Sequence, residues 1–86
     1  GEISNKMGEI MQLMSTQMQV ISITHLPQIA AKGNHHYKVY KEEMNGVIET
    51  QLRLLSQDER ITELAEMLGG KKLSDSAIAH ARELLN

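Results

Sequence analysis

The sequence lacks cysteine, phenylalanine and tryptophan, and it contains one proline and two tyrosines. Without cysteine there is no disulfide and no thiolate chemistry, a usage that fits an intracellular protein. Without large aromatic residues the core must be built from Ile, Leu, Val and Met, and the six Met give an adaptable packing surface. At 86 residues the chain is one domain at most, burying about 60–65% of its unfolded surface. We therefore expect marginal stability.

The chain also lacks an excess of positive charge and any long apolar run. Its 9 basic and 11 acidic residues give a net charge of -2, which provides no field to hold a phosphate backbone. Direct DNA binding by this chain is therefore not expected. No apolar run approaches the ~20 residues of a membrane-spanning helix, and no signal peptide opens the sequence. We expect no membrane contact.

The stretch at residues 19–28 organises the rest of the chain. Residues 18–23 are rich in apolar and β-branched side chains, which predicts a strand covered on both faces, as in parallel sheets. Thr24 and His25 follow, Pro27 suits the first turn of a helix, and Gly33 is a natural stop. Because ligands bind beyond the carboxyl ends of such strands, His25 lies where a ligand is expected. The start of the following helix would favour a bound phosphate there.

The other elements complete an α/β pattern, in the form of an α+β fragment. Residues 1–17 predict a helix whose apolar stripe we expect to be buried core: Ile3, Met7, Ile10 and Met14, widened by Met11. Helix, strand and helix together make half of a doubly wound unit. The helix begins at residue 1 without a capping signal, from which we expect an incomplete domain cut from a longer chain.

Residues 35–55 predict a β-hairpin turning at Asn45-Gly46. A four-residue loop would also place Tyr37 and Val39 on one face with Leu52 and Leu54. A two-residue loop at Asn45-Gly46 does so by pairing Val39 with Leu52 and Tyr37 with Leu54. It also sets Lys38 opposite Arg53 and Glu42 opposite Glu49, an unfavourable pairing that predicts a solvated polar face.

Two helices end the chain. Ser56 and Glu59 form a capping box, Gly69-Gly70 ends that helix, and Ser74 caps the next. The predicted buried positions are Ile61, Leu64, Ala65 and Leu68 in the first helix, and Ala77, Ile78, Ala81 and Leu85 in the second.

Few residues suggest a complete chemical site. The four histidines are His25, His35, His36 and His80. Adjacent strand residues point to opposite faces, so His35 and His36 do not readily share one ion, and we predict no metal site. Residues 69–72 resemble a phosphate-binding loop only faintly, and we interpret them as a solvated turn.

Four segments together resemble the RecN family of bacterial DNA repair proteins. They are ITHLPQIAAKG at residues 23–33, HYKV at 36–39, ERITELAEMLGG at 59–70 and AIAHARELL at 77–85. Proteins of this family are similar in plan to SMC proteins, with an ABC-type ATPase head split by a long coiled coil. The resemblance covers nearly the whole chain and implies that residues 1–86 are the C-terminal segment of such a head.

The resemblance implies specific roles. His25 would be the switch-loop histidine, which reaches the γ-phosphate and the attacking water, with Thr24 beside it. Gly1 and Glu2 would lie just past the D-loop, which aligns opposed heads. The Walker A lysine, the Walker B carboxylates and the signature motif would all precede residue 1. ATP and Mg²⁺ would therefore be cofactors of the full-length parent ATPase, while this segment alone should neither bind ATP well nor hydrolyse it.

The implied partners are the remaining half of the head, a second head in a homodimer, and DNA through the full-length protein. The implied setting is cytoplasmic and nucleoid-associated, in repair of double-strand breaks and recombination. An exposed edge at residues 18–23 would also let the segment self-associate. The alternative is a free-standing protein–protein interaction module without nucleotide chemistry, in which that strand would be fully paired. A helix-turn-helix DNA binder is a third reading, which the acidic balance disfavours.

Overall fold

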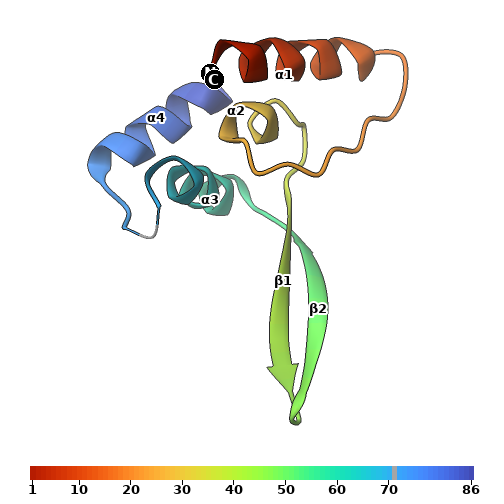
Figure 1. Ribbon diagram of the computed structural model, residues 1–86, viewed down its shortest axis with the longest axis vertical. Helices are drawn as coiled ribbons and strands as arrows, with labels where there is room; N and C mark the ends of the chain where they lie inside the picture. The colour runs from red at the N-terminus through yellow and green to blue at the C-terminus, as the bar shows by residue number, and fades with distance from the viewer. Residues whose placement is uncertain (71) are drawn as a thin grey trace.

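A computed structural model describes residues 1–70 and 72–86 and contains four helices and one β-hairpin within them. The order is α1 (Glu2–Met14), α2 (Pro27–Ala30), β1 (Tyr37–Met44), β2 (Val47–Leu54), α3 (Gln57–Gly69) and α4 (Asp75–Leu85) (Figure 1). The predicted α+β class is confirmed. No helix among the described residues is both long and apolar enough to cross a bilayer.

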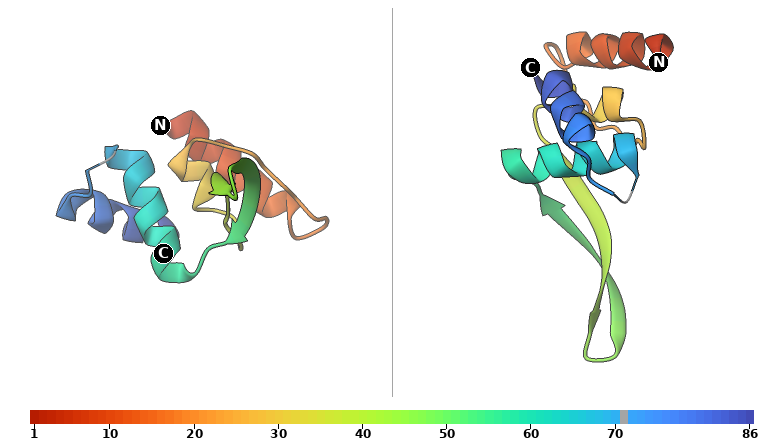
Figure 2. Two further views of the ribbon diagram at one scale, coloured as in Figure 1. Left: turned by 90° about the horizontal axis from the view of Figure 1, so that it is seen from below. Right: turned by 90° about the vertical axis from the view of Figure 1, so that its left-hand side faces the viewer.

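The hairpin forms with the predicted register. Tyr37 pairs with Leu54, Val39 with Leu52, and Glu42 with Glu49 in an antiparallel ladder. Asn45 and Gly46 take positive φ angles of 53° and 79°, as a two-residue hairpin loop requires. The hairpin projects from the helices as an arm (Figure 1 and the right-hand view of Figure 2).

The core lies between α3 and α4. Leu64 and Ala65 of α3 and Ala81 of α4 are fully buried, and Ala77 and Ala31 complete the cluster. Ile61, Leu68, Ile78 and Leu85 are half-buried around it. The Ser56 hydroxyl accepts from the Glu59 amide and the Glu59 carboxylate accepts from the Ser56 amide, so the predicted capping box is confirmed. Gly70, with φ 77°, follows the end of α3. The turn predicted at residues 69–72 includes Lys71, which lies outside the described residues.

Helix α1 packs on α2 through Gly8 rather than through its apolar stripe. A Cβ at Gly8 would lie 2.9 Å from Lys32 Cγ and 3.2 Å from the Gln28 carbonyl oxygen. The predicted core stripe is therefore wrong for this structure: Ile3, Met7, Ile10 and Met14 are 42–78% exposed. The helix also ends earlier than predicted, because the Ser15 and Thr16 hydroxyls donate to carbonyl oxygens of the last turn.

The predicted strand at residues 18–23 does not form. This segment is irregular, and residues 19–25 make no backbone–backbone hydrogen bond within the described chain. Ile21 is 82% exposed and Ile23 fully exposed. A strand needs a neighbour to pair with, and the described part of this chain provides none beside it.

Candidate functional site

The Thr24–His25 turn joins the irregular segment to α2. The Leu26 amide donates to the Thr24 hydroxyl at 3.0 Å, which closes the turn around His25. Leu26 is extended, with φ −98° and ψ 117°, as expected before a proline, and Pro27 is buried at the first turn of α2. Thr24 is half-buried and His25 exposed. The imidazole is therefore free to meet a ligand or another part of a protein.

Helix α2 is shorter than predicted and has four residues. Its backbone dipole is correspondingly small, so the expected phosphate-favouring helix start is not provided by α2 itself. The helix is instead fixed by burial of Pro27 and Ile29 and by an arginine from α3.

That arginine is Arg60, whose side chain is buried with 7% exposure. Its Nη2 donates to the carbonyl oxygens of Ala30 at 3.0 Å, Ala31 at 3.1 Å and Gly33. Burial lowers the pKa of Arg60 from its usual value. Its Nε and the neighbouring His36 Nδ1 are buried without a partner among the described residues. The guanidinium thus ties the end of α2 to α3.

His36 lies beside this arginine and is half-buried. Burial lowers the pKa of His36, and the positive charges of Arg60 and Lys38 lower it further. The negative charge of Glu63 acts in the opposite direction and raises it. The neutral imidazole is therefore favoured at this position.

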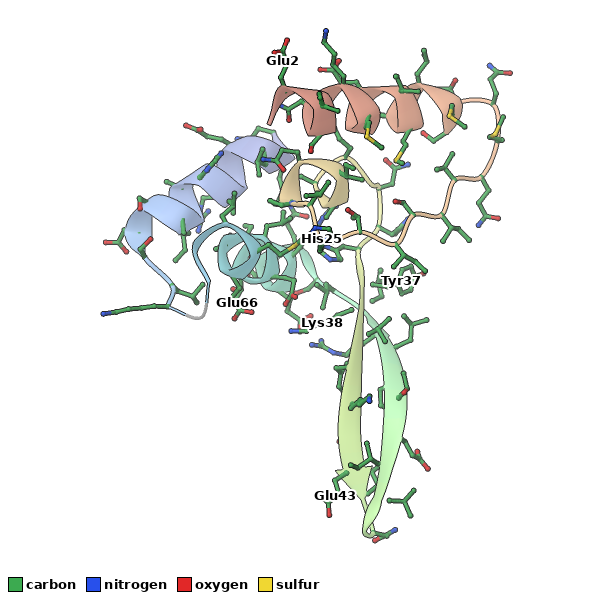
Figure 3. All side chains as sticks on the ribbon, viewed as in Figure 1. Glu2, His25, Tyr37, Lys38, Glu43 and Glu66 are labelled. Carbon is green, nitrogen blue, oxygen red and sulfur yellow. The ribbon has the colours of Figure 1, made fainter. Side chains whose placement is uncertain are left out.

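Two ion pairs fix the hairpin on α3. Lys38 Nζ lies 2.7 Å from Glu63 Oε2, and Arg53 pairs with Glu59. The hydrogen bond from Lys38 to Glu63 raises the pKa of Lys38. Figure 3 shows Lys38 on the α3 side of the hairpin and Tyr37 on the other side. Lys38 does lie opposite Arg53 in the hairpin, as predicted, but each of the two cations forms an ion pair with a glutamate of α3.

The other residues predicted at the nucleotide are not gathered around His25. Gly1 precedes the first turn of α1, and Glu2 opens that helix. Figure 3 shows Glu2 directed away from α2 and His25 on the opposite side of α1. Only Thr24 and His25 therefore form a local unit. The described residues hold no group of three or more metal-ligating side chains.

Arg60 was missed by sequence reasoning, although a signal was present. It precedes Leu64 by four residues, so it lies on the same face of the predicted helix. A charged side chain on an apolar face indicates a buried partner. Which carbonyl oxygens it would meet could not be predicted, because they lie 27 to 30 residues away in sequence.

Comparison with known proteins finds similarity along the whole chain. No family model matches. The chain is 44% identical over 85 residues to the DNA repair protein RecN of Deinococcus radiodurans. It is 40% identical over 85 residues to that of Vibrio cholerae and 37% identical over 86 residues to that of Haemophilus influenzae. Each alignment covers 99–100% of this chain and 15% of the relative, so the chain spans about 15% of the length of these relatives.

Proposed function

Because this chain is a RecN segment by similarity over its whole length, we propose that it is the C-terminal part of an ABC-type, SMC-like ATPase head. The whole protein would bind and hydrolyse ATP in the repair of DNA double-strand breaks and in recombination. It would act on DNA in the cytoplasm, at the nucleoid. The single observation that supports this proposal best is the position of His25, which is exposed in a closed turn after the irregular apolar segment at residues 18–23.

In this proposal His25 is the group that contacts the terminal phosphate. An imidazole N–H can donate a hydrogen bond to a γ-phosphate oxygen, and a ring nitrogen can orient the attacking water. Thr24 holds the turn that carries it. Mg²⁺ bound with ATP would be held by residues of the full-length protein that precede this segment, as the family resemblance implies.

The remaining half of the head would cover the apolar side chains that this chain leaves exposed. They form three groups: the α1 stripe (Ile3, Met7, Ile10, Met14), the irregular segment at residues 18–23 (Met18, Ile21, Ile23) and one hairpin face (Tyr37, Val39, Leu52, Leu54). So much exposed apolar surface is unusual for a small monomer. A second head would approach the side that carries Gly1 and Glu2. The alternative of a free-standing module expects residues 18–23 to be fully paired, and the unpaired backbone there favours the ATPase head instead.

The test is the substitution His25→Ala in the full-length protein. Loss of a preorganised donor at a reacting phosphate should lower kcat for ATP hydrolysis about a hundredfold. ATP binding, measured by a fluorescent nucleotide, should change little, because most of the phosphate contacts lie outside this segment in the proposal.

The matched control is His80→Ala, since His80 is an exposed histidine of α4. Its turnover should equal that of the unmodified protein. Unchanged hydrolysis by the His25→Ala protein would remove the role proposed for this residue.

A further inference from the structure

Arg60 is a buried cation whose hydrogen bonds to another element all go to backbone carbonyl oxygens. Its Nη2 serves Ala30, Ala31 and Gly33, at the end of α2 and in the turn that follows. No carboxylate forms an ion pair with it in the part of the chain that is described. A buried guanidinium is costly unless its donors are used, and the carbonyl contacts use Nη2 and offset part of that cost, while Nε has no partner among the described residues.

The carbonyl oxygens in turn require a hydrogen-bond donor from outside their own helix. The last carbonyl groups of a helix have no partner within the helix, and a four-residue helix does not hold itself together. A cation at that end satisfies them. Arg60 therefore fixes the carboxyl end of α2 to α3.

Short-range hydrogen bonds connect the residues that Arg60 contacts to Leu26 and Thr24, which lie on either side of His25. The amide of Ala30 donates to the Leu26 carbonyl at 3.0 Å, and the Leu26 amide donates to the Thr24 hydroxyl at 3.0 Å. Pro27 stiffens the backbone between them. On the other side of His25, residues 19–24 make no backbone–backbone hydrogen bond within the described chain. The anchored side of the His25 turn is thus the α2 side.

We propose that Arg60 is a positioning residue for His25, which fixes through α2 where the imidazole meets the terminal phosphate of a nucleotide. This inference rests on the proposed function of His25. Arg60 touches neither the nucleotide nor the reacting atoms. Its removal changes the placement of the histidine and leaves the histidine itself intact.

The experiment compares ATP hydrolysis by the full-length protein carrying Arg60→Met, Arg60→Lys or His25→Ala, and the double substitution. Misplacement of a catalytic group by about 1 Å costs up to a hundredfold, so Arg60→Met should lower kcat about ten- to a hundredfold with little change in KM. Lysine keeps the charge and three donors, and Arg60→Lys should recover part of that loss. In the His25→Ala background, Arg60→Met should add less than about a twofold effect, because both act through one group.

The matched control is Arg53→Gln. Arg53 also reaches α3, but its partner is Glu59 at the exposed start of the helix. This variant should hydrolyse ATP at the normal rate. If it lost as much kcat as Arg60→Met, a general loosening of α3 would explain both results and the inference would fail.

Hydrogen exchange in the same proteins provides a readout separate from turnover. In Arg60→Met, amides at residues 29–31 should exchange at least tenfold faster, while the amides of α3 and α4 keep their protection. Loss of protection throughout α3 and α4 would mark Arg60 as a core residue only and overturn the inference. If Arg60→Met hydrolysed ATP with a normal kcat while His25→Ala had a reduced kcat, this inference would fail and the proposed function of His25 would stand. Normal kcat in His25→Ala would overturn the proposed function itself.

Discussion

Adjacent residues at the start of α3 illustrate how environment decides the role of a charge. Glu59 lies at the surface, within the capping box and beside Arg53, and Arg60 is buried against carbonyl oxygens. The hydrogen bond from the Ser56 amide, followed by that from Arg53, lowers the pKa of Glu59 to about 2. Both residues connect α3 to another element, but the two contacts respond differently to pH and to substitution.

The depressed pKa of Glu59 predicts a pH dependence of stability. Since the folded-state pKa lies below the ordinary 4.5, ionised Glu59 favours the folded state above pH 4.5. This contribution should fall as the pH drops from 4.5 towards 2, and Glu59→Gln should flatten the unfolding free energy across that window. An NMR titration of the Glu59 carboxyl carbon, with the exposed hairpin residue Glu43 as control, measures the shift directly. A midpoint for Glu59 equal to that for Glu43 would contradict the expectation.

Residue-level features were predictable from sequence where they depend on near neighbours. The Ser56–Glu59 capping box spans three residues, and the Asn45-Gly46 turn depends on two residues that tolerate positive φ. The contacts of Arg60 and the pairing of Lys38 with Glu63 join residues 25 to 30 positions apart. Which residues form such distant pairs depends on how the helices and the hairpin pack together.

At the scale of elements, the hairpin and the segment at residues 18–23 both show that a strand forms where a partner strand is present. The hairpin carries its own partner strand, so the alternation of Tyr37 and Val39 with Lys38 sufficed to predict its register. The segment at residues 18–23 has strand composition but no neighbouring strand among the described residues. Its expected neighbours would come from outside this chain. The α1 stripe is exposed for the same reason in our proposal.

The segment at residues 18–23 gives a prediction that separates this chain from the whole protein. Ile21→Asp in the 86-residue chain should change the unfolding free energy by less than about 0.5 kcal/mol, since Ile21 is already 82% exposed. In the full-length protein a strand buried on both faces would place this carboxylate in an apolar site. The same substitution should then cost roughly 3 kcal/mol or more, measured by chemical denaturation.

The control for this comparison is Gln17→Asp, an exposed polar position just before the segment. It should be near neutral in both proteins. An Ile21→Asp substitution that is equally harmless in the full-length protein would show that residues 18–23 stay exposed there.

The shape of the whole molecule fits a piece that needs further protein around it. Its radius of gyration is 14.2 Å, against about 12 Å expected for a compact chain of this length. The principal extents of 43 × 34 × 21 Å reflect the projecting hairpin (Figure 2). The exposed side chains lie on α1, on the irregular segment at residues 18–23 and on the hairpin, three separate parts of the fold. A covering domain would meet all of them, and in our account it brings the nucleotide to His25.

The most direct measurement is a structure of the full-length protein with Mg²⁺ and a non-hydrolysable ATP analogue. We predict that a ring nitrogen of His25 lies within hydrogen-bond distance, about 2.7–3.2 Å, of a γ-phosphate oxygen or of the water in line with it. We also predict that residues 18–23 are paired on both sides within a sheet. A His25 ring directed away from the nucleotide, with residues 18–23 still unpaired, would contradict the account.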